Sequence, residues 1–171
     1  QNIAEEVIEE IQVVEQSTTT STSTTVQSLM KRQFPFSCSA SSSLGDGWSC
    51  EKIYDNEPSS WQDKSLECAD ATLEFTFSKD VYFEFLTYEN LDDSKSFKRN
   101  FKPRDILITS EEEGFSIEYE LENQNTSTQW IDLNTTTSVI TIQILSAYPG
   151  EEVNGAAVSY THLTLPTTGI V

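Results

Sequence analysis

Short segments in which apolar and polar residues alternate recur between residues 34 and 157, and they constrain the fold more than any other feature of the chain. They cover residues 72–77, 81–86, 105–109, 115–121, 129–133 and 139–145. In the first of them Leu73, Phe75 and Phe77 share one face, which is the period-two pattern of a strand packed on one side. No long helical pattern interrupts the series, so we predict an all-β fold, an antiparallel β-sandwich.

The charge of the chain limits its partners. Its 171 residues include 10 Lys and Arg against 28 Asp and Glu, a formal net charge of -18. Such a chain repels nucleic-acid phosphates and anionic lipid headgroups, so we expect neither as a partner. The length suits one domain. No stretch approaches the roughly eighteen consecutive apolar residues of a transmembrane segment.

The first 33 residues are predicted to lie outside the folded domain. Residues 1–16 carry apolar residues at helical spacing, namely Ile3, Val7, Ile11 and Val14. This pattern predicts either a short amphipathic arm that frays, which we favour, or the end of a longer coiled coil. Residues 17–33 begin with a run of Ser and Thr that cannot form a core. We therefore predict a flexible N-terminal arm and a linker, either O-glycosylated or a plain tether.

The C-terminal end carries a different signal. Residues 158–167, with the sequence VSYTHLTLPT, resemble the translation of a sequencing adapter, so we predict that residues 158–171 are a non-native tail. His162, the only histidine, lies in this tail. The rest of the chain contains no recognisable arrangement of a nucleophile and a base, so we expect no enzyme activity.

Residues 34–157 resemble the discoidin or coagulation-factor type C domain. The resemblance rests on the order of several weak motifs: SASSS at 39–43, EKIYDNEPSSW at 51–61, ILITSEEEG at 106–114, WIDL at 130–133, and residues 144–157. It implies a jelly roll of the galactose-binding-like type. A close runner-up is the glycan-binding module of NAD glycohydrolases, which FKRNFKPR at 97–104 resembles and which shares that jelly roll.

Both families end in a strand that pairs beside the first one. The predicted non-native tail stands where this strand is expected, so the folded domain is predicted to lack its native last strand. The alternation of residues 160–165 imitates a strand, so a structure computed from the sequence is expected to lay them into the gap.

The resemblance also implies a structural calcium ion, because discoidin-type domains often hold one in the loop that corresponds to residues 55–60. Asp55, Glu57 and Ser60 are the candidate oxygen ligands. The loop departs from the family pattern, with Asn56 in place of glycine and Ser60 in place of threonine. The alternative is a solvated turn in which Asp55 bonds to its own backbone.

Four residues are candidates for ligand binding. Trp48 lies in the glycine-flanked segment GDGW, where an exposed indole can stack on a sugar ring, and core packing is the alternative. Asn100, Lys102 and Arg104 can donate hydrogen bonds to sugar hydroxyls or carboxylates. Scattered charges of this kind are also common on ordinary surfaces.

Three cysteines and two glycosylation sequons favour an extracellular location. A Cys50–Cys68 disulfide would tie the ligand-side loops together and stabilise the fold by about 3 kcal/mol. Pairing of Cys38 with Cys50 and a fully reduced set are the alternatives. The sequons begin at Asn125 and Asn134, in predicted loops.

Together these features predict a non-catalytic binding module, secreted or on the cell surface. Carbohydrate binding or cell adhesion is the first hypothesis, and a protein-interaction or structural module of a multidomain extracellular protein is the second. The expected partner is accordingly a glycan or an extracellular protein. Aromatic residues such as Trp48 would line a small concave rim in the first case and a broad flat patch in the second.

Overall fold

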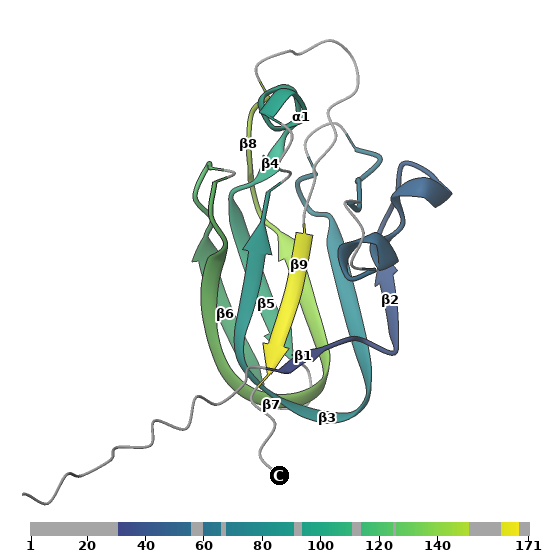
Figure 1. Cartoon of the computed structure of the whole chain (residues 1–171), viewed down its shortest axis with the longest axis vertical. Coiled ribbons are helices and arrows are strands. Elements are labelled where there is room, and N and C mark those ends of the chain that lie inside the picture. Colours follow the sequence, from purple (N-terminus) through teal and green to yellow (C-terminus); the bar gives the residue numbers. More distant parts are fainter. Residues whose placement is uncertain are drawn as a thin grey trace, which may run out of the picture.

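The computed structural model of the chain describes residues 31–55, 60–65, 68–90, 94–110, 114–124, 126–150 and 162–167 (Figure 1). For residues 31–32, 94–96 and 162–167 it describes the backbone alone. The predicted arm of residues 1–16, most of the predicted linker and Glu57 lie outside this part of the chain. None of the described helices is long and apolar enough to cross a membrane.

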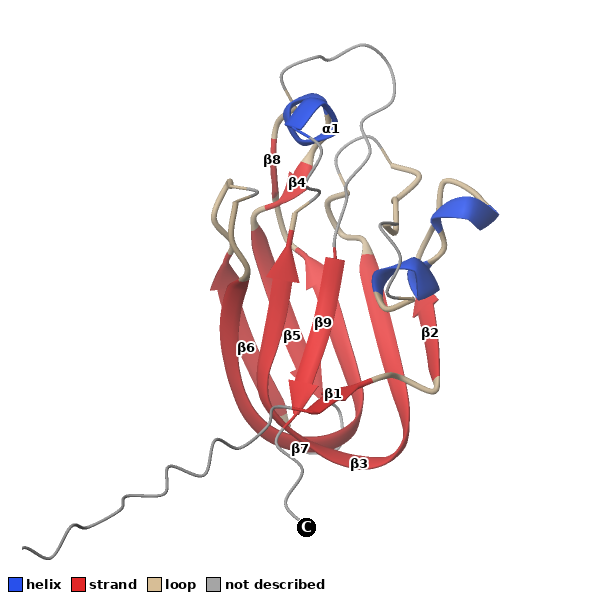
Figure 2. Ribbon diagram, in the orientation of Figure 1, coloured by secondary structure: helices blue, strands red, loops and turns tan. Residues whose placement is uncertain are grey.

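The described residues are mainly β-strands, with a few short helical turns at one end (Figure 2). The strands are β1 (Lys31–Gln33), β2 (Ser37–Ala40), β3 (Thr72–Glu89), β4 (Lys102–Pro103), β5 (Asp105–Ser110), β6 (Phe115–Glu120), β7 (Gln129–Ile144), β8 (Ala147–Tyr148) and β9 (His162–Thr167). The helical turns are η1 (Asp46–Trp48), η2 (Cys50–Ile53) and α1 (Ser94–Arg99).

The two longest strands, β3 and β7, build the sandwich because they pair with each other on both sides of a bend. Residues 72–76 of β3 pair with residues 139–143 of β7, and residues 81–88 pair with residues 129–137. Figure 1 shows both strands curving at the lower end of the molecule. β2 and β9 lie beside the two halves of β3, and β5 and β6 continue the sheet from β7. All these pairs are antiparallel, which confirms the predicted all-β, antiparallel sandwich.

The strands differ from the sequence prediction in one respect. Residues 72–77 and 81–86 were expected to be separate strands, but they belong to the single strand β3, and residues 129–133 and 139–145 both belong to β7. The polar residues Ser78, Lys79 and Asp80 are exposed at the bend. They separate the two predicted strands in the sequence, but the backbone stays extended and changes only its register with β7.

The core lies between the two layers and is formed by the inward-facing residues of the long strands. Its most deeply buried side chains include Trp61, Phe75, Phe83, Leu86, Tyr88, Ile106, Ile108, Leu121, Ile131, Ile140 and Ile144. Phe77 and Phe83, on the two sides of the bend in β3, bring their ring centroids to 4.9 Å. The alternating pattern therefore places its apolar residues where the sequence predicts them.

The disulfide joins Cys38 to Cys50, whose Cα atoms lie 6.0 Å apart. The predicted Cys50–Cys68 pairing is wrong, and the alternative pairing is confirmed. The physical reason is that η2 packs against β2, which brings Cys50 beside the strand that carries Cys38. Cys68 instead takes a position in the hydrophobic core.

Strand β9 occupies the place beside β3 that the last strand was expected to fill. Thr87, Tyr88 and Glu89 of β3 pair with it on one side, and β1 pairs with it on the other. β9 comes from the stretch predicted to be a non-native tail. β1 uses the last three residues of the predicted linker.

Candidate functional site

The candidate site lies at the upper end of the sandwich in Figure 1, where β4 and β8 form a separate two-stranded ribbon. In this ribbon Lys102 pairs with Tyr148 and Pro103 with Ala147. Arg104 follows β4 directly, and its backbone N–H donates to the carbonyl of Ser146 (2.9 Å). Its own carbonyl accepts from the N–H of Leu121 (2.7 Å). The backbone of Arg104 thus joins the ribbon to the end of β6.

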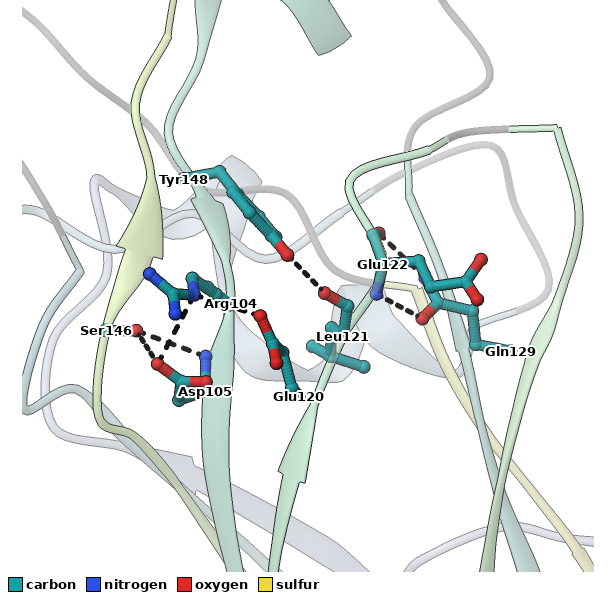
Figure 3. Close-up of polar contacts among 8 residues, drawn as sticks. All are labelled: Arg104, Asp105, Glu120, Leu121, Glu122, Gln129, Ser146 and Tyr148. Carbon is teal, nitrogen blue, oxygen red and sulfur yellow. Dashed lines mark hydrogen bonds and ion pairs between the residues drawn. The ribbon is translucent and has the colours of Figure 1, made fainter.

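The guanidinium of Arg104 is held between two carboxylates. Its Nε lies 3.3 Å from Oε1 of Glu120 and 3.6 Å from Oδ2 of Asp105. The arginine side chain is 47% exposed and that of Glu120 is 62% exposed, so solvent reaches both groups. Asp105 is fixed in turn by the hydroxyl of Ser146, which donates to Oδ2. Figure 3 shows the two terminal nitrogens of Arg104 pointing away from Glu120.

The ring of Tyr148 lies next to this guanidinium. The Cζ atom of Arg104 is 5.9 Å from the ring centroid, and the phenol donates to the carbonyl of Leu121 (2.9 Å; Figure 3). Burial and the nearby carboxylate of Glu120 raise the pKa of Tyr148, and Arg104 partly opposes them. The phenol therefore stays protonated and keeps donating at neutral pH.

Two hydrogen bonds hold the loop between β6 and β7 next to these residues. The N–H of Glu122 donates to Oε1 of Gln129 (2.6 Å), and Nε2 of Gln129 donates back to the carbonyl of Glu122 (3.0 Å; Figure 3). Gln129 is buried, so both hydrogen bonds are partly buried. We call Arg104, Asp105, Glu120, Ser146 and Tyr148 the Arg104 surface.

Asn100 and Lys102 lie close to Arg104 in sequence but are buried. The ammonium of Lys102 donates to the carbonyls of Phe97 (2.9 Å) and Asn100 (3.1 Å) and lies 4.6 Å from the centroid of the Phe97 ring. It thereby caps the C-terminal end of α1, where a cation is favourable. Oδ1 of Asn100 lies 3.4 Å from Nε of Arg99. Their placement supports a structural contribution, and their predicted ligand contacts stay predictions.

Trp48 lies on a different side of the same end. It is the last residue of η1, and its backbone N–H donates to the carbonyl of Gly45 (2.8 Å). In Figure 2 the short helices near β2 are separated from β4 and β8. Trp48 is 38% exposed, so it is not a core residue. The structure does not bring it together with Arg104, and its contact with a ligand stays a prediction.

The predicted calcium loop is described only in part. Asp55 forms an ion pair with Lys52 (3.2 Å). Ser60 is buried, and its Oγ has no hydrogen-bond partner among the described residues. Within the same part of the chain, His, Cys, Asp and Glu side chains form no group of three or more that could hold a metal. The calcium ion stays a prediction.

Most residues of the Arg104 surface were not predicted from the sequence. Asp105 follows Arg104 in the sequence, but Glu120, Ser146 and Tyr148 lie farther along the chain, and only the fold brings them to Arg104. Trp130 was not predicted either. It is 48% exposed and packs edge-to-face on Phe85 with ring centroids 5.7 Å apart. A signal for Trp130 was present, because it occupies the polar face of the alternating residues 129–133.

Comparison with known proteins finds structures with a similar fold but no protein with a similar sequence. No protein-family model matches the chain, and no curated protein matches it. Among solved structures, the family 32 carbohydrate-binding module of NanJ from Clostridium perfringens, in complex with galactose, superposes with a TM-score of 0.58 at 14% identity. The match covers 76% of this chain and 92% of that one.

Two further structures give similar values. Discoidin II from Dictyostelium discoideum matches with a TM-score of 0.57 at 11% identity, over 79% of this chain and 55% of that one. A fucose binding module from Streptococcus pneumoniae matches with a TM-score of 0.52 at 11% identity, over 80% and 93% of the two chains.

The chain has the fold of these modules. The predicted resemblance to discoidin-type, galactose-binding-like domains is therefore confirmed for the fold. At such low identities the similarity carries no residue of a binding site from one protein to the other.

Proposed function

We propose that this chain is a non-catalytic carbohydrate-binding module and that its Arg104 surface contacts the sugar. The observation that carries the proposal is which atoms of the Arg104 side chain already have partners. Its ion pairs with Asp105 and Glu120 use Nε, and its Cζ atom lies over the ring of Tyr148. The terminal amino groups of the guanidinium are therefore available to a ligand from a side chain that is already fixed in place.

The chemistry of this surface suits a sugar. Sugar hydroxyls both donate and accept hydrogen bonds, so they pair with the guanidinium and with a carboxylate at the same time. The exposed carboxylate of Glu120 accepts, and the terminal nitrogens of Arg104 donate. Because the ion pairs and Tyr148 already hold Arg104, little side-chain entropy is lost on binding.

Two other observations support the proposal. The structural neighbours include a module in complex with galactose, a module in complex with GalNAc and a fucose binding module. The Cys38–Cys50 disulfide is typical of oxidising compartments, in keeping with a protein that is secreted or at the cell surface. A glycan is therefore the partner that we propose.

The second candidate function is a protein-interaction module, and Trp130 is the observation that favours it. The exposed Trp130 and its neighbour Phe85 lie on the outward face of the β3–β7 sheet. Exposed tryptophan on a flat surface is typical of protein interfaces. The two functions use different side chains, so single substitutions distinguish them.

A glycan array probed with the full chain tests the proposal. We expect selective binding of a neutral sugar that Arg104→Ala weakens at least about tenfold, corresponding to about 1.4 kcal/mol for one lost charge-assisted hydrogen bond. Lys79→Ala is the matched control, because Lys79 is an exposed cation at the bend of β3, at the other end of the sandwich. A folded chain that binds no glycan, or one in which Arg104→Ala binds as wild type does, contradicts the proposal.

Calcium in the loop of residues 55–60 is proposed as a structural ion. Asp55 and the buried hydroxyl of Ser60 would supply hard oxygen ligands. Calcium is then expected to raise the melting temperature of wild type, and Asp55→Asn to abolish the rise. An equal melting temperature with calcium and with chelator would remove the ion from the proposal.

A further inference from the structure

Asn134 occupies an irregular position in the middle of β7. Phe83 pairs with Thr135 and Phe85 pairs with Asp132, which leaves two residues of β7 opposite the single residue Glu84. Asn134 has a positive φ of 49°. Asparagine adopts this left-handed conformation more readily than most residues, so the sequence suits this bulge. The sequon at Asn134 was expected in a loop, and the structure places it in a strand instead.

The side chains of the sequon face outward beside an aromatic ring. Asn134 and Thr136 are exposed, whereas Thr135 between them is buried. Thr136 pairs across the ladder with Tyr82, so these two side chains share the outward face. The phenol of Tyr82 donates to Oδ1 of Asn134 (3.0 Å), and Nδ2 of Asn134 donates to no described residue.

We propose that Asn134 carries an N-linked glycan and that its first sugar packs on Tyr82. In the reaction Nδ2 of Asn134 forms a bond to the anomeric carbon of an oligosaccharide carried on a polyprenyl diphosphate. The bond from that carbon to the diphosphate breaks, the diphosphate leaves with its electron pair, and Nδ2 loses one proton. The acceptor sequence Asn134-Thr135-Thr136 fulfils the requirement of the transferase.

The folded structure accommodates this modification without rearrangement. Attachment at Nδ2 leaves Oδ1 of Asn134 as the acceptor for Tyr82, so the existing hydrogen bond is kept. The outward direction of Asn134 sends the glycan into solvent. Tyr82 is 36% exposed, and its ring offers an apolar surface to the first sugar.

The glycan also leaves the Arg104 surface open. β3 and β7 bend at the lower end of the molecule in Figure 1, and Asn134 precedes that bend by a few residues of β7. β4 and β8 lie at the upper end. The modification is therefore independent of the proposed sugar-binding function, and each can fail without the other.

Secretion of the full chain from a mammalian culture, behind a signal peptide, tests the proposal. The variant Ser127→Ala removes the other sequon, Asn125-Thr126-Ser127, so any remaining N-glycan must lie on Asn134. Peptide mass spectrometry before and after peptide N-glycosidase then identifies the site. In this background we expect Asn134 to be glycosylated, Thr136→Ser to keep the glycan and Thr136→Val to lose it.

Thr136→Val preserves the β-branched shape of the side chain and leaves Asn134 in place, so a lost glycan is not a sign of misfolding. A secreted, folded chain with unmodified Asn134 would overturn the proposal, whether or not Asn125 is glycosylated in wild type. For the contact with Tyr82, enzymatic deglycosylation is expected to lower the melting temperature of wild type more than that of Tyr82→Ser. Equal shifts would overturn that contact.

Discussion

At the scale of single residues, Gly150 shows how closely the backbone packs at the upper end of the sandwich. A Cβ atom on Gly150 would meet the carbonyl carbons of Arg99 at 2.7 Å and Asn100 at 3.0 Å. Both are backbone atoms at the C-terminal end of α1, and they cannot move aside as the end of a flexible side chain can. Gly150 therefore lets the segment that follows β8 pass against the end of α1.

Gly150→Ala is expected to lower the free energy of unfolding by about 1–3 kcal/mol, the usual cost of overpacking. Urea denaturation followed by tryptophan fluorescence measures this change. Gly47→Ala is the matched control, because its Cβ meets no atom within 4 Å and its change should stay within about 1 kcal/mol. Equal urea midpoints for both variants would mean that the backbone near Arg99 shifts to accommodate the added methyl group at little cost.

Tyr88 gives a prediction about alkaline pH. Its side chain is buried, and its phenol donates to Oδ1 of Asn90 (2.6 Å). Burial is the main cause that raises the pKa of Tyr88 above its ordinary value of 10.0. A raised pKa in the folded state stabilises the fold below pH 10 and loses this contribution as the pH rises toward the folded-state value.

The free energy of unfolding is thus expected to fall between about pH 9 and about pH 11, because the unfolded chain releases the phenolic proton first. Tyr88→Phe has no proton to release, so its stability should decline less over this range, although it starts lower. Denaturation at both pH values compares the two slopes. If the two slopes are parallel, the loss of stability at alkaline pH comes from the other tyrosines.

At the scale of the elements, the sequence located the strands well but not their connections. Alternation identified all the long strands, because burial of one face of a sheet imposes a period of two. It could not show that Ser78, Lys79 and Asp80 continue one strand, because exposed polar residues occur both in turns and at bends of a strand. Only pairing with β7 distinguishes these cases.

The candidate site was predictable to a smaller extent. Arg104 was identified from its donor groups, but its partners come from β5, β6 and β8, which no local pattern brings together. Lys102 was expected at the surface because lysine is seldom buried. The carbonyls at the end of α1 replace water around its ammonium, and this compensation depends on the fold.

The disulfide between β2 and η2 gives a prediction at this scale. Cys38→Ser is expected to lower the free energy of unfolding by about 2–3 kcal/mol, because the crosslink of a short loop restricts the unfolded chain. Thermal denaturation measures the change, and peptide mapping without reductant should recover Cys38 bound to Cys50. A peptide that joins Cys50 to Cys68 would contradict the structure.

At the scale of the whole molecule, the charge of the chain bears on the proposed ligand. With a net charge of -18, the field around the protein opposes the approach of anions. Arg104 is itself neutralised by Asp105 and Glu120. Both facts favour a neutral sugar over a sialylated or sulfated one, and they explain why we expect Arg104 to act through hydrogen bonds and not through net charge.

The closure of the sandwich depends on β9. Within the described part of the chain, β1 pairs with β9 alone, and residues Thr87, Tyr88 and Glu89 of β3 have β9 as their outer neighbour. Deletion of residues 162–171 leaves that edge of β3 open. We expect a loss of about 2–4 kcal/mol, from a few ladder hydrogen bonds at about 1 kcal/mol each, and self-association through the open edge.

Urea denaturation and light scattering during size-exclusion chromatography measure both effects. Deletion of residues 168–171 is the control, because it leaves β9 intact. A third variant replaces residues 162–167 by another alternating sequence of Thr and Val. Its stability should match wild type, since any chain of strand period can supply the backbone ladder. If it fails while the control folds normally, then specific side chains of β9 are required, and residues 162–167 are matched to this fold.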